Sequence, residues 1–367
     1  MKFKKIIATA LITSFLFLAG CSDSKIEKTA TPSGDFIKIV DCVGRELEVP
    51  KNPETVACLF AVSSHMVSML GDSQKIVAVA KGNKRDYMFL DIYPEINNAR
   101  TPKGSGDFNM EELFKDPAPE LVFAYTDIVE DKKIMDKFNK FKVPVVAICF
   151  KTVEEQQYTM SLIGKIMGRE EKARAYNDYY NSVIKLVSER VAVIPESDKK
   201  TVYHAINELL RTDTKNSLPA DWLPLTGVKN VGVATGEGTG AGKNFLTLEQ
   251  LFLLDPEYMI INGTDVKQYI EAKETLHKLT AYQKGNIFLM PLGVSRWGHP
   301  YSIETPLAIL WTAKTIYPEV FTDIDIFKET KVFYKDFFDY DLSDEDVQKI
   351  VEGKEFKQIM GGREASN

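Results

Sequence analysis

Residues 107–125 read DFNMEELFKDPAPELVFAY, and residues 244–263 read NFLTLEQLFLLDPEYMIING, so one pattern occurs twice in the chain. The equivalent positions are Glu111 and Glu249, Leu113 and Leu251, Phe114 and Phe252, and, after a shift of one residue, Pro119-Glu120 and Pro256-Glu257. Each copy predicts a short amphipathic helix, a stop at a proline and a buried strand, which is one step of an α/β layer fold. The repeat therefore predicts two similar lobes, and acidic residues at equivalent places on two lobes suit a symmetric partner.

Apolar runs of strand length alternate with helical patterns on both sides of a middle segment. The predicted strands are Thr55–Phe60, Ile76–Ala80, Leu121–Tyr125 and Val143–Cys149 in the first lobe, then Thr201–Ile206, Tyr258–Gly263 and Asn286–Met290 in the second, where a long helix from about Ile303 to Ile316 follows. Strands that alternate with helices predict a mainly parallel sheet flanked by helices. The fold class is therefore α/β, with an N-terminal lobe over residues 36–152 and a C-terminal lobe over residues 193–358.

The middle segment, residues 153–192, carries apolar positions at helical spacing, with Gly164 and Gly168 as interruptions. A helix of about 20 residues after Arg169 would be ~30 Å long. One long inter-lobe helix permits less hinge motion than two or three extended strands would.

The N-terminus has the features of an exported lipoprotein. Three lysines at positions 2, 4 and 5 precede an apolar stretch of 13 residues, Ile6 to Leu18, which ends in Leu18-Ala19-Gly20-Cys21. The stretch is too short for a membrane-spanning helix, which needs ~20 residues. The motif resembles a bacterial lipobox and predicts a signal peptide over residues 1–20, lipidation of Cys21 and a flexible linker over residues 21–35. The expected location is the extracytoplasmic face of the cell membrane, or the periplasm.

The composition is that of a globular protein, with 44% hydrophobic and 27% charged residues. A mature chain of about 347 residues is long enough for two domains. Loss of the three N-terminal lysines changes the net charge from −6 to −9. An acidic protein of this kind is not expected to bind nucleic acid.

Three cysteines besides Cys21 lie in apolar, strand-like surroundings: Cys42, Cys58 and Cys149. Buried free thiols are the first expectation for all three. A disulfide between Cys42 and Cys58 is the alternative, although nothing else suggests a disulfide-stabilised scaffold.

Two sequence patterns that resemble catalytic or metal-binding motifs do not match those motifs in detail. The segment GEGTGAGKN at 236–244 lacks the spacing of a phosphate-binding loop, and Asn244 stands where a Ser or Thr would hold magnesium, so a place at the rim of a cleft is expected instead. The four histidines, His65, His204, His277 and His299, are too scattered for a spaced metal motif. We expect His65 and His277 to be structural or solvated, and we predict neither catalytic residues nor an intrinsic cofactor.

Several stretches together carry a resemblance to a known family. They are DCVGRELEVPKNPETVACLF, LGDSQKIVAVA, ELVFAY, TLEQLFLLDPEYMIING and GVSRWGHPYSIETPLAILWTAKTIYPEVF. With the lipobox, they resemble the periplasmic or lipoprotein substrate-binding proteins of ABC importers for ferric siderophores and cobalamin, over nearly the whole mature chain. The resemblance implies two α/β lobes joined by one long helix, a ligand held between the lobes, and delivery to a dimeric permease driven by an ATPase.

The loop Ser295-Arg296-Trp297-Gly298-His299-Pro300-Tyr301 is the main candidate for ligand binding, since it follows a predicted buried strand. Open α/β sheets bind ligands at the carboxyl ends of their strands. Trp297 and Arg296 suit a large planar or anionic chelate, with His299 as a hydrogen-bond donor or metal ligand; the alternative for Trp297 is that it covers a hydrophobic seam. The other candidates are Tyr125, placed by the resemblance, Tyr301, and, more weakly, Arg85, Tyr87 and Arg100.

The resemblance also implies that Glu111 and Glu249 project from the tops of the lobes and pair with permease arginines, with Glu112 as the rival of Glu111. The expected cargo is an iron(III)–siderophore complex, with a corrinoid, heme or nickel chelate as alternatives of the same importer class. A secreted metal-dependent hydrolase and a cell-surface adhesin are the alternatives of other classes.

Overall fold

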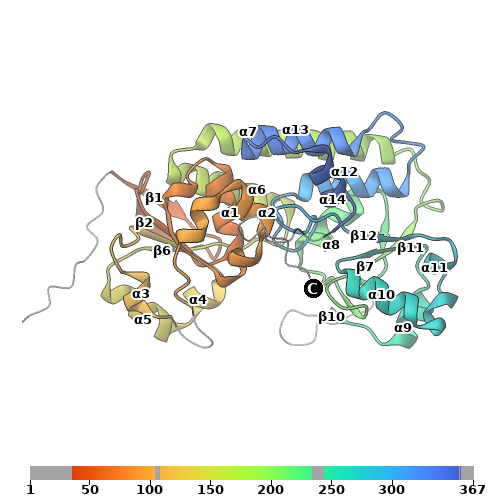
Figure 1. The fold of residues 1–367 in the computed structure, drawn as a ribbon, viewed down its shortest axis with the longest axis horizontal. Helices are drawn as coiled ribbons and strands as arrows, with labels where there is room; N and C mark the ends of the chain where they lie inside the picture. The colour runs from red at the N-terminus through yellow and green to blue at the C-terminus, as the bar shows by residue number, and fades with distance from the viewer. Residues whose placement is uncertain (1–34, 104–107, 234–243, 355, 357–367) are drawn as a thin grey trace, which may run out of the picture.

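Two parallel four-stranded sheets form the framework of the protein (Figure 1). The computed structural model describes residues 35–103, 108–233, 244–354 and Phe356. The first sheet has the order β4-β3-β5-β6, with β3 (Val56–Cys58), β4 (Ile76–Val79), β5 (Leu121–Ala124) and β6 (Val145–Ala147). The second has the order β12-β11-β7-β9, with β7 (Thr201–Ala205), β9 (Lys229–Asn230), β11 (Tyr258–Ile261) and β12 (Ile287–Leu289). The two-lobed α/β fold class is confirmed.

Helices flank each sheet. Those of the first lobe are α1 (Ala61–Met69), α2 (Tyr87–Ile92), α3 (Met110–Leu113), α4 (Thr126–Glu130) and α5 (Lys132–Lys140). Those of the second are α8 (Leu218–Trp222), α9 (Leu248–Leu254), α10 (Thr264–Ala272), α11 (Thr280–Gln283), α12 (Thr305–Ile316), α13 (Ile326–Phe338) and α14 (Asp344–Val351). Among the described residues, no helix has both the length and the apolar character needed to cross a membrane.

The internal repeat forms the same structure twice. In the first copy the Asn109 side chain accepts a hydrogen bond from the Glu112 amide at the start of α3, and β5 follows. In the second copy Thr247 and Gln250 form a reciprocal capping box at the start of α9, and β11 follows. Capping satisfies backbone N–H groups that have no partner within the helix, which explains why such short helices form.

An N-terminal hairpin, β1 (Phe36–Val40) and β2 (Glu46–Pro50), was not among the predicted strands. The turn that joins its strands covers the free edge of β6: Arg45 Nη2 donates to the Val145 carbonyl at 2.8 Å, and the Asp41 carboxylate accepts from the Ala147 amide at 3.2 Å. Arg45 and Asp41 also form an ion pair at 2.6 Å. Their side chains thus bond to backbone groups of an edge strand that could otherwise pair with another chain.

A disulfide joins Cys42 to Cys149, so the expectation for these two cysteines was wrong. Their Cα atoms are 5.6 Å apart although 107 residues separate them in sequence. The pairing arises because the hairpin turn packs against the end of β6, where the Cys42 amide approaches the Ala147 carbonyl. Cys58, the other partner that we considered for Cys42, is a buried free thiol within β3, as first expected.

The connection between the lobes consists of two helices, α6 (Val153–Met167) and α7 (Glu170–Val191). Gly168 ends α6 with a positive φ of 66°, a conformation that glycine adopts readily. The 22 residues of α7 match the predicted rod, and this helix runs along both lobes in Figure 1, with α13 beside it. Aromatic contacts join the two helices, among them Tyr176 with Phe333 and Tyr179 with Phe337.

The largest hydrophobic cluster draws buried residues from both lobes and from the helices between them. It includes Phe89 and Phe123 of the first lobe, Tyr180 of α7, and Trp297 and Phe333 of the C-terminal part. A core shared in this way resists separation of the lobes, because opening it would expose apolar surface to water.

Candidate functional site

A cleft with a volume of about 790 Å³ lies between the lobes. Its lining residues lie within the segments after the strands, 60–65 after β3, 82–88 after β4 and 292–301 after β12, together with Asn207 after β7 and with Phe356. Not every residue of these segments faces the cleft. The carboxyl ends of parallel strands are the usual binding edge of α/β sheets. This cleft is therefore the candidate ligand site.

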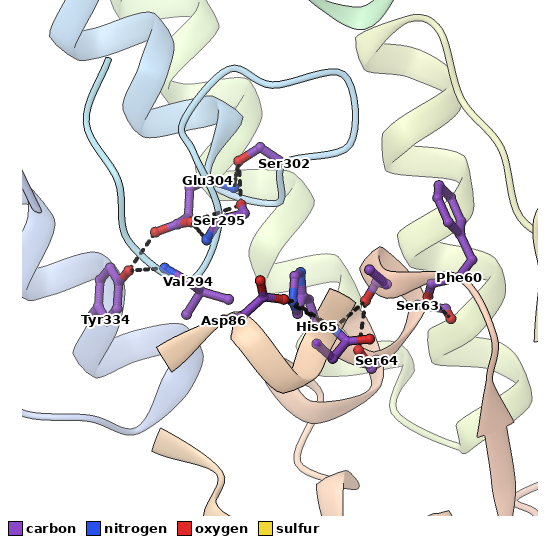
Figure 2. A network of polar contacts seen from close by, with 12 residues as sticks. Phe60, Ser63, Ser64, His65, Asp86, Val294, Ser295, Ser302, Glu304 and Tyr334 are labelled. Atoms are coloured by element: carbon purple, nitrogen blue, oxygen red, sulfur yellow. Dashed lines mark hydrogen bonds and ion pairs between the residues drawn. The ribbon is translucent and has the colours of Figure 1, made fainter. Parts of the chain in front are cut away.

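The N-terminal wall is organised around His65, which is buried in α1 (Figure 2). Its Nε2 lies 3.1 Å from the amide nitrogen of Asn83 and 3.2 Å from a carboxylate oxygen of Asp86. The Asn83 amide also donates to the carbonyl of Ala61, at the first residue of α1. These contacts fix the segment that carries Arg85 and Tyr87 into the cleft lining. His65 therefore holds a cleft wall, a role that its helical position alone did not reveal.

The C-terminal wall is organised around Glu304, a fully buried carboxyl group. It accepts hydrogen bonds from the Tyr334 hydroxyl at 2.5 Å, the Ser295 amide at 2.7 Å and the indole N–H of Trp297 at 3.0 Å. Burial raises the pKa of Glu304, and these donors oppose that rise. A side chain at Gly293 would overlap both Tyr334 and Glu304. Figure 2 shows Val294 and Ser295 in this network, in which the Tyr334 hydroxyl also accepts a hydrogen bond from the Val294 amide at 3.0 Å. With the bond from Trp297, these contacts hold the loop in place.

Trp297 is completely buried and is not among the residues that line the cleft. The expectation that its indole stacks on the ligand is corrected: the ring belongs to the core and its N–H is bonded to Glu304. The alternative that Trp297 covers a hydrophobic seam describes this placement. Its neighbours Arg296, His299 and Tyr301 line the cleft, and their contact with a ligand stays a prediction.

Positive charge is present on both walls, from Arg85 in the N-terminal lobe and Arg296 in the C-terminal lobe. Burial lowers the pKa of His299 to about 4, and the positive charges of His204, Arg296 and Arg211 act in the same direction. The imidazole of His299 is therefore neutral at pH 7 and can offer a nitrogen lone pair to a ligand.

His204 lies in the buried strand β7 and interacts electrostatically with His299. Its Nδ1 is 3.0 Å from the Asp213 carboxylate, and its Nε2 is 3.1 Å from the amide oxygen of Asn262. Burial alone would lower the pKa of His204, but the carboxylate and the two hydrogen bonds raise it above the ordinary value. When protonated, His204 repels a second positive charge on His299, which is one of the causes that lower the pKa of His299.

Aromatic side chains bridge the lobes at one end of the cleft. The Tyr301 hydroxyl donates to the Tyr125 hydroxyl at 2.9 Å, and the Phe60 ring lies 4.8 Å from both tyrosine rings. Tyr125 thus touches Tyr301 but is not among the cleft-lining residues. In this conformation the pair connects one lobe to the other.

Two other residues considered in the sequence, Arg100 and His277, are not part of the cleft lining. Arg100 donates to the carbonyls of Val77, Lys115 and Pro117 and lines a separate surface pocket, not the cleft. His277 stacks on Tyr282 and is bonded to the backbone at Glu271. The Gly-rich segment 236–244 lies, except for Asn244, outside the described residues. Cys21 also lies outside the described residues.

Comparison with known proteins identifies the family to which the chain belongs. A family model for periplasmic binding proteins matches residues 56–292. The chain belongs to the periplasmic binding protein family. The molybdate-binding protein MolA of Haemophilus influenzae is 24% identical over 361 residues, which cover 92% of this chain and 97% of that protein.

Solved structures of periplasmic binding proteins show the same fold. A periplasmic solute-binding protein from Veillonella parvula has a TM-score of 0.74 at 22% identity, covering 86% of this chain and 97% of that one. CeuE of Helicobacter pylori, solved with Ni(II) bound, has a TM-score of 0.68 at 17% identity, covering 86% and 99%. Molybdate and nickel, the ligands named for MolA and CeuE, differ in chemistry. The ligand of this chain therefore has to be inferred from the residues of its own cleft.

The paired glutamates of the repeat lie on the side of the binding protein away from α7. Helices α3 and α9 occupy the lower ends of the two lobes in Figure 1, opposite α7. Glu111 and Glu249 are exposed, whereas Glu112 is half-buried and lines a separate surface pocket. Of the two neighbours in the first copy, Glu111 is thus the one that faces solvent.

Proposed function

We propose that the chain is the extracytoplasmic binding protein of an ABC importer and that it captures an anionic metal chelate between its lobes. An iron(III)–siderophore complex is the first candidate, and corrinoid, heme and nickel chelates are alternatives within the same class. The observation that carries the proposal is the lining of the cleft, which combines an arginine on each wall with aromatic and apolar side chains.

The size of the cleft favours a chelate over a small ion. A volume of about 790 Å³ lies in the range of pockets that take drug-sized ligands. Guanidinium groups bind carboxylate and catecholate oxygens through charge-assisted hydrogen bonds, and aromatic side chains such as Phe60 and Tyr87 cover the planar parts of a chelate. The neutral ring of His299 suits an open coordination position on the metal.

A tetrahedral oxyanion is the second candidate, because the relative MolA binds molybdate. Arg85 and Arg296 could hold such an anion from two sides. A metal-dependent hydrolase receives less support: the described residues contain no group of three or more His, Cys, Asp or Glu side chains arranged to hold a metal ion.

Isothermal titration with three probes tests the proposal: the iron(III) complex of a tricatecholate siderophore, nickel(II)–histidine and sodium molybdate. We expect binding of the iron complex, weakened about tenfold or more by Arg296→Ala and by Arg85→Ala. Arg174→Ala, which removes an exposed arginine from α7, is the control and should have no effect. Binding of molybdate alone would select the oxyanion, and no binding of any probe would reject this ligand class.

Two partners complete the proposed function. Glu111 and Glu249 would dock on arginines of the two permease subunits, whose ATPase drives transport. Lipidated Cys21 would hold the protein at the outer face of the cell membrane, with residues 21–35 as the linker.

A further inference from the structure

Phe356 lies after the last helix, α14, and is one of the residues that line the cleft. It also packs against the main hydrophobic cluster. The family model matches only residues 56–292, so this position lies outside the matched part of the chain. The C-terminal segment therefore adds a wall residue of its own to the cleft.

Backbone contacts fasten the chain to the cleft loop just before this residue. The Leu292 amide donates to the Ile350 carbonyl at 2.9 Å, which ties the cleft loop to α14. The Gly353 amide donates to the same carbonyl at 3.0 Å and has a positive φ of 67°. A Cβ atom at Gly353 would lie 2.7 Å from the Met290 carbonyl oxygen, so the turn packs tightly against the end of β12. This attachment holds the end of α14 against the cleft loop.

Apolar side chains make up a large part of the cleft lining. Six of them come from both lobes and the C-terminal segment: Phe60, Val62, Met88, Leu292, Val294 and Phe356. A small oxyanion surrounded by arginines would leave this apolar surface unused, whereas an anion with an aromatic or aliphatic face would cover it.

We propose that Phe356 contacts the bound solute and that the solute is an anion carrying an aromatic or other apolar face. The inference rests on the proposed function and narrows its substrate class. Among chelates, it favours those with aromatic ligand groups, such as catecholates, over bare oxyanions and small hydrophilic complexes.

Titration of the iron(III) tricatecholate complex tests the contact. Phe356→Ala should weaken binding about tenfold, and Phe356→Leu should restore most of the affinity because it returns apolar area. Phe327→Ala removes a partly exposed phenylalanine from α13 and should leave affinity unchanged. Wild-type affinity in Phe356→Ala would overturn the inference, and so would an equal loss for molybdate, since that would reflect a disturbed cleft.

A second measurement needs no ligand and separates this inference from the proposed function. In Phe356→Trp, the added fluorescence should be blue-shifted and weakly quenched by acrylamide, relative to Phe327→Trp as the exposed control. If the wild type binds none of the probes, the ligand proposal fails, while protected fluorescence would still support the position of residue 356 in the cleft wall. Fluorescence as accessible as that of the control would place the residue in solvent and overturn the inference.

Discussion

Glu304 is a buried polar residue that holds the C-terminal wall of the cleft. Its carboxyl group is stabilised by a hydroxyl, an indole N–H and a backbone amide. A buried carboxyl group needs such donors, since leaving it unpaired would cost several kcal/mol. The arrangement places Ser295 and Arg296 at the surface of the cleft.

The pKa of His299 leads to a prediction on acid stability. An imidazole titrates near pH 6.5 in the unfolded chain but near 4 in the folded protein, so its contribution to stability is complete above about pH 6.5. As the pH falls from 6.5 to 4, the unfolded state binds a proton that the folded state does not, and stability falls by an amount on the order of 1–3 kcal/mol.

Urea unfolding of wild type and His299→Gln at pH 7, 5.5 and 4.5 would measure this contribution. The substitution should make the fall in stability at low pH shallower, while His277→Gln controls for removal of an imidazole elsewhere. If the unfolding free energies of wild type and His299→Gln fall in parallel between pH 7 and 4.5, the imidazole takes up its proton in the folded protein as it does in the unfolded chain. That result would contradict the prediction.

Cys21 gives a second prediction at the level of one residue. If its thiol carries the lipid, Cys21→Ser should release the mature protein from the membrane fraction or leave it unprocessed, with unchanged ligand affinity, because two or three acyl chains account for stable attachment. Cell fractionation and titration of the purified mutant measure both. Equal membrane retention of mutant and parent would refute lipid anchoring.

Sequence patterns predicted several cleft residues and misplaced one for a definable reason. Gly298 and Pro300 predicted a loop at the end of a strand, and Arg296 and Tyr301 do line the cleft. Trp297 lies in the same loop but turns inward, because its partner Glu304 is seven residues further on. That choice depends on tertiary packing, as does the pairing of Cys42 with Cys149.

At the scale of elements, the sequence indicates helix ends best where the residues that satisfy the backbone hydrogen bonds lie close by in the chain. The capping residues before α3 and α9, and the glycine that ends α6, can be read from the sequence. No comparable sequence signal indicated the β1–β2 hairpin. Its turn covers strand β6, which is distant in sequence, so its role depends on tertiary contacts. Predicted strands were mostly longer than observed ones, since apolar residues continue past the last paired residue.

The two short helices of the repeat carry the docking prediction. A glutamate in a first helical turn is stabilised by the helix N-terminus, and this alone would explain each of them. If Glu111 and Glu249 also dock on permease arginines, the double substitution Glu111→Arg, Glu249→Arg should reduce uptake in reconstituted vesicles by roughly tenfold or more.

Ligand affinity and melting temperature should stay nearly the same in that double mutant, since both side chains are exposed. Glu154→Arg with Glu171→Arg changes two exposed acidic residues on α6 and α7 and is the matched charge control. If the docking mutant supports uptake at the wild-type rate while permease and ATPase are active, the docking role is excluded. The two glutamates would then only stabilise the starts of their helices.

For the whole molecule, the connection between lobes predicts little domain motion. Helix α7 spans both lobes, α13 packs beside it, and the ion pair of Arg169 with Asp72 at 2.8 Å anchors the start of α7 to the N-terminal lobe. Small-angle scattering curves with and without bound solute should therefore nearly superimpose. A large decrease in the radius of gyration on ligand addition would contradict this prediction, because it would show that the lobes move relative to each other.

The central claim is that this binding protein carries an anionic metal chelate in its inter-lobe cleft. Native mass spectrometry of the protein purified from its own cells, grown under varied metal supply, tests it most directly. We predict a co-purifying mass of an iron(III)–siderophore or related chelate, at one per protein, that is lost in Arg296→Ala. A bound tetrahedral oxyanion in its place, or no bound solute under any metal supply, would contradict the claim.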